Sequence, residues 1–142
     1  MRKPIKRKEP NYKYHTVMLV DDNELDNFIN QKVIEGNFFA EKIYVNTSGA
    51  SALEFLKNLL VAKDEVNDLI PEVIFVDINM PLMDGFQFID EYDKLPESAR
   101  NNTKLAILTT SISIQDKEKA SKYGDRILFI NKPLNEENLD NL

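Results

Sequence analysis

The stretch VIFVDINMPLMDG, residues 73–85, places a carboxylate directly after a run of four apolar residues. A short apolar run bounded by turn residues is typical of a fully buried strand. Burying an unpaired carboxylate is costly, so Asp77 at the end of this strand needs a partner or a chemical role. An Asp before a proline-containing loop can also simply cap the turn, and the residue alone does not decide between these readings.

Four further β-branched or aliphatic runs, residues 16–20, 42–45, 105–108 and 127–130, alternate with segments of helical spacing. This alternation is the pattern of a parallel sheet wrapped by helices, and 142 residues are enough for one domain with its own core. We therefore expect an α/β fold of the flavodoxin-like, doubly wound kind. Its five-stranded parallel sheet would have the order 2-1-3-4-5, with helices on both faces.

Apolar residues at helical spacing predict the helices between these strands. Ser48 and Ser113 are positioned to cap the second and fourth helices, a third helix is expected at about residues 86–95, and a short last helix begins near Asn135. Residues 61–71 and 96–103 are expected to be long loops. The expected apolar faces are Leu25, Phe28, Ile29 and Val33 in the first helix, Leu53, Leu56 and Leu60 in the second, and Phe88, Ile89, Tyr92 and Leu95 in the third.

Polar groups follow four of the five predicted strands, where ligands bind in open α/β sheets. Three clustered carboxylates should raise a pKa or recruit a cation, and oxygen ligands without His or Cys favour Mg²⁺. With a metal, a lysine and a hydroxyl could offset the charge of a phosphoryl group, which would make Asp77 a nucleophile. These groups are Asp21, Asp22, Asp77, Thr109 and Lys132.

Four of these segments, in order, carry a family resemblance: the Asp21-Asp22 pair, the VDINMPLMDG block, ILTTS at residues 107–111 and INKPL at residues 130–134. Together they resemble the receiver domain of bacterial two-component response regulators. The similarity runs from about His15 to residue 142, which divides the chain into a basic, flexible tail at residues 1–14 and a receiver domain at residues 15–142.

The resemblance implies a role for each matching residue. Asp77 would accept the phosphoryl group, and Asp21 and Asp22 would bind Mg²⁺ together with Asp77 and the backbone carbonyl of Asn79. Thr109 would move to the phosphoryl group, Lys132 would pair with it, and Phe129 would swing inward on activation. A cis peptide is expected before Pro133. Such a protein is a phosphoacceptor rather than an enzyme, and catalyses only its own phosphotransfer and autodephosphorylation.

The partners are implied in the same way. A sensor histidine kinase or a histidine phosphotransfer protein would supply the phosphoryl group, and a downstream protein would read the surface of the fourth helix and fifth strand. A phosphorylation-dependent homodimer is a further possibility. The long loop at residues 61–71 is similar to that of stand-alone receivers that serve cyanobacterial and phytochrome-type kinases. Thr110 departs from the small residue usual in the family, which could narrow access to the phosphate.

Two alternatives remain open beside the receiver reading. A haloacid-dehalogenase-type phosphatase also uses an aspartyl nucleophile, but it needs a second acidic group two residues later, where this chain has Asn79. A degenerate receiver could act as a constitutive interaction module, although all five reactive positions are present. His15, the sole histidine, precedes the first strand and is expected to have no catalytic role.

Charge and composition limit the partners further. Six basic residues against Glu9 give residues 1–13 a net charge of +5, which leaves −11 for the rest of a chain whose total is −6. An acidic body repels a nucleic-acid backbone, so no direct nucleic-acid binding is expected. There are no cysteines, which excludes disulfides and thiolate sites. No run is long enough for a signal peptide or a membrane span, so we expect a cytoplasmic protein with no membrane contact.

Overall fold

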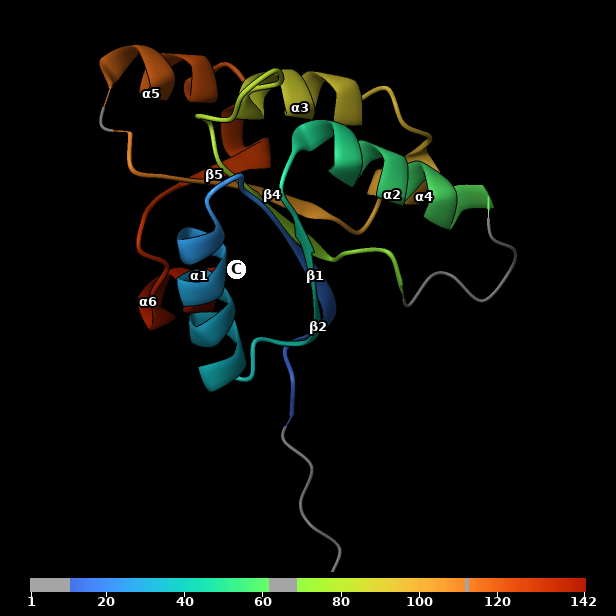
Figure 1. Ribbon diagram of the computed structural model, residues 1–142, viewed down its shortest axis with the longest axis vertical. Helices are drawn as coiled ribbons and strands as arrows, with labels where there is room; N and C mark the ends of the chain where they lie inside the picture. Colours follow the sequence, from blue (N-terminus) through green and yellow to red (C-terminus); the bar gives the residue numbers. More distant parts are fainter. Residues whose placement is uncertain (1–10, 62–68, 112) are drawn as a thin grey trace, which may run out of the picture.

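Five parallel strands form one sheet in the order β2-β1-β3-β4-β5 (Figure 1), in a computed structural model that describes residues 11–61, 69–111 and 113–142. The expected strand order is confirmed. Each strand starts and ends within two residues of its predicted limits. The strands are β1 (Tyr14–Val20), β2 (Ala40–Asn46), β3 (Val73–Val76), β4 (Lys104–Thr109) and β5 (Ile127–Asn131).

Helices cover both faces of the sheet, as predicted. Figure 1 shows α1 (Glu24–Gly36) and α6 (Glu136–Asp140) on one face, and α2 (Gly49–Val61), α3 (Gly85–Tyr92) and α5 (Ile114–Ser121) on the other. Two short elements complete the fold. The single turn α4 (Glu97–Arg100) lies within the segment expected to be a loop, and the 3-10 turn η2 (Gly124–Arg126) leads into β5.

The sheet separates two hydrophobic cores. Alternate residues of β1 show the division, because Met18 and Val20 pack under α2 and α3, whereas Val17 and Leu19 pack under α1 and α6. All four residues of β3 are buried, which explains why residues 73–76 form a continuous apolar run rather than an alternating one.

Most of the local predictions are confirmed. The predicted inward residues of the third helix are all buried, and both expected caps form, since the hydroxyl of Ser48 accepts from the Ser51 N–H and that of Ser113 from the Asp116 N–H. Tyr14, which was assigned to the tail, is the first residue of β1. Residues 1–10 of the predicted tail and residues 62–68 of the predicted long loop lie outside the described residues.

The predicted inner face of α1 is wrong for three of its four residues, since of these four Val33 alone packs against the core. Leu25, Phe28 and Ile29 lie on the outside of the helix, with exposed fractions of 65%, 56% and 40%, while Asn27 and Asn30 are buried. The reason is local: the Asn27 side chain donates to the carbonyl of Asp21 at 2.8 Å, and Asn30 Oδ1 accepts from the Leu134 N–H at 3.4 Å. The amino-terminal half of α1 thus packs on loops whose buried backbone groups need hydrogen-bond partners.

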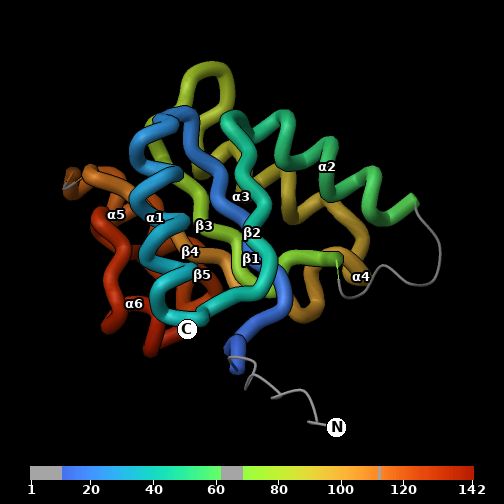
Figure 2. The backbone as a smooth tube through the Cα atoms, turned by 60° about the horizontal axis from the view of Figure 1, so that its bottom comes forward, coloured from blue at the N-terminus to red at the C-terminus, as the bar shows by residue number. Residues whose placement is uncertain are grey.

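Parallel register brings the carboxyl ends of the strands to one edge. Val20 pairs with Val76, Val76 with Ile107, and Thr109 with Asn131. The loops after β1, β3, β4 and β5 therefore leave the sheet side by side, and we call this edge the carboxyl rim (Figure 2). No helix in the described ranges has the length and apolar character needed to cross a bilayer.

Candidate functional site

The loop after β1 fixes Asp21 at the carboxyl rim through its backbone. The N–H of Asp21 donates to the carbonyl of Asn46 at 3.1 Å, and its own carbonyl accepts from Asn27. One carboxylate oxygen accepts from the Asn23 N–H at 3.0 Å, so Asp21 is buried and held in place, whereas Asp22 is exposed. Asn23, rather than either aspartate, caps α1 by accepting from the Asp26 N–H.

Asp77 is placed at the rim by the strand before it and the helix after it. Its N–H donates to the carbonyl of Val20 at 3.0 Å, which continues the pairing of β3 with β1. The loop then returns so closely that Gly85 donates to the carbonyl of Ile78 at 2.9 Å. A Cβ on Gly85 would lie 2.5 Å from the carbonyl oxygen of Asp77. Asp84 caps α3 in a capping box with Gln87.

The structure brings the three predicted acidic residues together. Carboxylate oxygens of Asp21, Asp22 and Asp77 all lie within 4.8 Å of one another. Two of the three are buried, so their mutual repulsion is only weakly screened by solvent. An oxygen-only donor set of this kind fits a hard cation such as Mg²⁺. Asn79 is exposed two residues beyond Asp77, and the role of its backbone carbonyl stays a prediction.

Lys132 reaches the same cluster from the loop after β5. Its Nζ lies 2.5 Å from Asp21 Oδ2, 2.8 Å from Asp26 Oδ2 and 3.7 Å from Asp77 Oδ1, and its side chain is only 7% exposed. Its N–H donates to the carbonyl of Thr109 at 2.8 Å, and the expected cis peptide before Pro133 is present. Burial by itself would lower the pKa of Lys132, but the hydrogen bonds to Asp21 and Asp26 raise it overall.

The electrostatics of Asp77 follow from the same contacts. Burial raises the pKa of its carboxyl group, the charge of Lys132 lowers it, the neighbouring Asp21 raises it again, and the Thr109 hydroxyl lowers it. The balance is a raised pKa. The negative charge of this carboxylate is only partly offset by its neighbours, so any additional positive charge at the rim stabilises its ionised form.

Thr109 and Phe129 lie on neighbouring strands and on the same side of the sheet. Phe129 pairs with Ile107, two residues before Thr109, and packs partly buried against the core under α2, α3 and α5. Thr109 is fully buried, and its hydroxyl accepts from the Ser111 N–H at 3.2 Å. All the predicted site residues with described side-chain contacts therefore lie at the rim or directly below it.

Sequence reasoning missed the residues of α1 that support the site. Asp26 pairs with Lys132, and Asn27 holds the backbone of Asp21. A usable signal was present, because polar residues at positions 23, 26, 27 and 30 follow the Asp21-Asp22 pair at helical spacing and therefore share the face that points to the rim. The apolar stripe of the same helix is the stronger pattern, and it led to the opposite prediction for the inner face.

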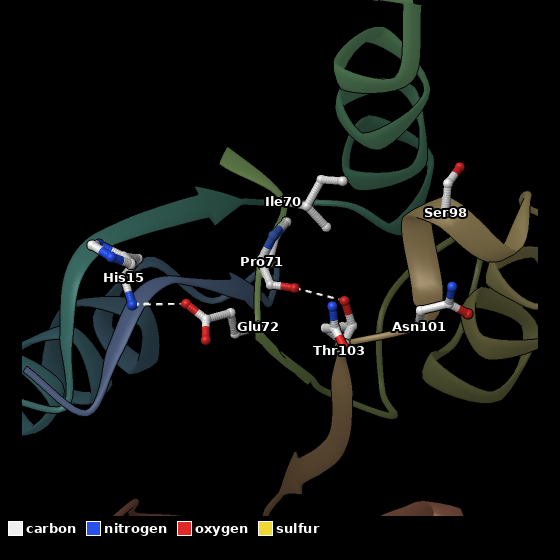
Figure 3. Close-up of a pocket in the computed structure, with 8 residues that line it drawn as sticks. His15, Ile70, Pro71, Glu72, Ser98, Asn101 and Thr103 are labelled. Carbon is white, nitrogen blue, oxygen red and sulfur yellow. Dashed lines mark hydrogen bonds between the residues drawn. The ribbon is translucent and has the colours of Figure 1, made fainter. Parts of the chain in front are cut away.

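An open cavity of about 700 Å³ lies at the opposite, amino-terminal edge of the sheet (Figure 3). Two hydrogen bonds join residues that line it: the His15 N–H donates to Glu72 Oε1 at 2.8 Å, and the Thr103 hydroxyl donates to the carbonyl of Pro71 at 2.7 Å. The imidazole of His15 contacts Glu41 at 3.3 Å. His15 is the second residue of β1 and not, as predicted, a residue before it, but it lies at the opposite end of the strand from Asp21, away from the rim, as expected.

Comparison with known proteins gives a consistent result. Residues 17–142 match the response regulator receiver domain family. The chain is 30% identical over 125 residues to the sensor histidine kinase CheAY of Helicobacter pylori, covering 88% of this chain and 14% of that protein. It is 26% identical over 100 residues to the response regulator Rcp1 of Synechocystis sp., covering 70% of this chain and 65% of that protein.

A solved structure agrees with the fold. The crystal structure of a two-component response regulator from Cytophaga hutchinsonii superposes with a TM-score of 0.77 at 30% identity, covering 90% of this chain and 92% of that one. The chain spans less than two thirds of the length of the two sequence relatives. The family match nevertheless covers nearly all of the sheet and the whole carboxyl rim, and the chain belongs to the response regulator receiver domains of two-component signalling.

Proposed function

We propose that this protein receives a phosphoryl group on Asp77 from a phosphohistidine of a sensor histidine kinase or phosphotransfer protein. The observation that supports this most strongly is the convergence at the rim: Asp77, two further carboxylates within 4.8 Å and the Lys132 ammonium at 3.7 Å. A nucleophile surrounded by a cation site and a fixed ammonium is the arrangement that phosphoryl transfer requires.

The chain's own residues account for the transfer step. A carboxylate oxygen of Asp77 attacks phosphorus while the bond from phosphorus to the donor nitrogen breaks, and the electron pair returns to the imidazole. Lys132 offsets charge on the phosphoryl oxygens. Asp21, Asp22 and Asp77, with the carbonyl of Asn79, would hold Mg²⁺, which supplies further positive charge there when bound. Beyond this transfer, we expect the chain to catalyse only the hydrolysis of its own aspartyl phosphate.

Transfer changes the charge beside Thr109 and so has a route to the surface. An aspartyl phosphate adds acceptor oxygens next to a buried hydroxyl, and Thr109 gains by donating to them. Thr109 and Phe129 share one side of the sheet, so a shift of Thr109 frees space toward Phe129. The surface of α5 and β5 is then the one that changes, in a two-state switch.

The partners proposed for this surface are proteins. The body of the chain is acidic, which disfavours a nucleic-acid target. A second surface is suited to the protein that donates the phosphoryl group. Leu25, Phe28 and Ile29 expose apolar area on α1, the helix that directly follows Asp21 and Asp22. Exposed apolar side chains beside a reactive rim are suited to contact with a donor protein.

The transfer is tested by intact mass after incubation with phosphoramidate, with and without Mg²⁺. We expect a metal-dependent, alkali-labile gain of one phosphoryl group in the wild type and in the control variant Asp84→Asn, and no gain in Asp77→Asn. Labelling that persists in Asp77→Asn would refute the assignment. If the wild type is not labelled, a spectral shift with beryllofluoride would indicate fast hydrolysis, and its absence an interaction module.

The switch is tested with the ¹H–¹⁵N spectra of residues 113–131 with and without beryllofluoride. In the wild type we expect shifts that extend from Thr109 through α5 to Phe129. Thr109→Ala removes the hydroxyl that couples the phosphoryl group to this surface, and should confine the shifts to the rim. Identical responses in the two proteins would contradict the coupling.

A further inference from the structure

Lys132 has a carboxylate partner that the proposed function does not use. Asp26 lies in the first turn of α1, and its Oδ2 is 2.8 Å from the Lys132 Nζ. Its side chain is 31% exposed, against 6% for Asp21 and 9% for Asp77. Asp26 is thus the outermost of three carboxylates around one buried ammonium, and it lies outside the acidic cluster of Asp21, Asp22 and Asp77.

The three distances show how the ammonium is shared. Nζ has three N–H donors, and hydrogen bonds to Asp21 and Asp26 occupy two of them. Asp77, at 3.7 Å, is within ion-pair range but beyond hydrogen-bond distance. In this resting arrangement Lys132 is held by Asp21 and Asp26 and has not closed on the acceptor.

We infer that Asp26 is a positioning residue: it shares the Lys132 ammonium with Asp21, which weakens the hold of Lys132 on the acidic cluster, and it thereby favours Mg²⁺ binding while opposing premature pairing of Lys132 with the phosphoryl group. The inference rests on the proposed function, because it assigns a role within the same phosphorylation site. It adds a residue of α1 to the groups that determine how tightly this site binds Mg²⁺ and the phosphoryl group.

Two consequences of opposite sign follow from the contacts. Lys132 and a divalent cation compete for Asp21 and Asp77, so a further carboxylate that shares the ammonium of Lys132 weakens this competition and strengthens cation binding. Once the acidic cluster is neutralised, Asp26 is the carboxylate of the three that still competes with phosphoryl oxygens for Lys132. Removing its charge should therefore weaken Mg²⁺ binding and tighten binding of a phosphoryl analogue at saturating Mg²⁺.

The size of both effects is modest. An ion pair with one partly exposed member contributes less than about 1 kcal/mol to the free energy of ligand binding. This corresponds to about a two- to fivefold change in each dissociation constant. A folding defect at the rim would weaken the binding of both ligands. The opposite signs therefore separate a positioning role from a merely structural one.

The experiment measures two dissociation constants for the full chain by calorimetry: that of Mg²⁺ alone and that of beryllofluoride at saturating Mg²⁺. Asp26→Asn keeps the shape of the side chain and removes its charge, and Asp26→Glu restores the charge. Glu24→Gln is the matched control, because it removes a carboxylate from the same turn that forms no hydrogen bond or ion pair with the described residues.

We expect Asp26→Asn to bind Mg²⁺ two- to fivefold more weakly and beryllofluoride two- to fivefold more tightly, with Glu24→Gln and Asp26→Glu close to the wild type. In a Lys132→Gln background, Asp26→Asn should change Mg²⁺ affinity no more than Glu24→Gln does, because its effect passes through Lys132. Equal effects of Asp26→Asn and Glu24→Gln, or weaker binding of both ligands, would overturn the inference alone. A wild type that binds neither ligand would overturn the proposed function and the inference with it.

Discussion

At Asp77, burial and charge oppose each other, and single neighbouring residues decide the outcome. Burial and Asp21 raise the pKa of the carboxyl group, while Lys132 and Thr109 lower it. These residues end or follow different strands, and their convergence was predictable because the carboxyl ends of parallel strands share an edge. The contact between Asp26 and Lys132 was not predictable, because it depends on how α1 is rotated about its axis.

Gly85 is the residue on which the geometry of the acceptor loop depends most directly. In Gly85→Ala, the added Cβ would meet the carbonyl oxygen of Asp77 at 2.5 Å and the Cα of Ile78 at 3.0 Å, both backbone atoms that cannot rotate away. We expect a loss of about 1–3 kcal/mol in the free energy of unfolding and slower labelling by phosphoramidate. Urea denaturation and the initial rate of mass gain measure the two effects.

Gly36→Ala is the matched control. A Cβ on Gly36, the last residue of α1, meets nothing within 4 Å, so the same change should leave labelling intact and leave stability unchanged or raise it by up to about 1 kcal/mol. Wild-type stability in Gly85→Ala would show that the loop does not return as closely as described.

At the scale of elements, α1 shows what periodicity can and cannot predict. The spacing of apolar residues correctly predicted a helix after the first strand, but three of the four residues of the apolar stripe are exposed, and the buried face contains Asn27, Asn30 and Ile34. A hydrophobic pattern identifies the inner face only where the surface beneath is apolar. Here that surface includes loop backbone, and hydrogen bonding decides the rotation of the helix.

Two alanine substitutions in α1 test this rotation. Ile34 is fully buried under the sheet, so Ile34→Ala should cost about 2–5 kcal/mol of unfolding free energy. Leu25 is 65% exposed, and Leu25→Ala should change it by less than about 0.5 kcal/mol. Both are measured by urea denaturation. A reversed order of the two costs would mean that the apolar stripe faces the core after all.

A second element-scale prediction concerns the contact between α3 and the segment that follows α5. The Tyr123 hydroxyl donates to Asp90 at 2.7 Å. Burial, that hydrogen bond and the charges of Asp90 and Asp93 raise the pKa of Tyr123 to about 12. Since the unfolded phenol titrates near its usual value of about 10, this contact stabilises the fold fully below pH about 10 and is lost between pH about 10 and 12.

Tyr123→Phe should therefore lower stability at pH 7 by about 1 kcal/mol and lose less stability than the wild type between pH 10 and 12. The free energy of unfolding at pH 7, 10 and 11 measures this. Tyr12→Phe, the same change at an exposed tyrosine away from Asp90, should retain the wild-type alkaline loss. An unchanged alkaline loss in Tyr123→Phe would show that the contact with Asp90 does not hold in solution.

For the whole molecule, the alternation of five apolar runs with helical segments was enough to predict the sheet, its order and the location of the site. What it could not provide is the rotation of α1, whose apolar stripe faces mostly outward, or that a turn of helix, α4, forms within a proline-containing loop. Strand order follows from general rules of chain connection, whereas these details depend on particular hydrogen bonds.

The acidic cluster predicts a response of the whole fold to metal. Because a ligand of the native state stabilises it by mass action, millimolar Mg²⁺ should raise the melting temperature by about 2–6 °C, and a chelator should reverse the shift. Asp22→Ala, which removes the exposed member of the cluster, should lose most of the shift, whereas Asp125→Ala, an exposed carboxylate of η2, should keep it. A full shift in Asp22→Ala would place the metal elsewhere.

The central claim, that Asp77 carries the phosphoryl group, is tested most directly by locating the modification. Borohydride reduces an aspartyl phosphate to homoserine, which peptide mass mapping can assign to one residue. After phosphoramidate treatment with Mg²⁺, we predict homoserine at position 77 and at no other aspartate, with no conversion when Mg²⁺ is omitted. Homoserine at Asp21, Asp22 or Asp26 instead of Asp77 would contradict the account.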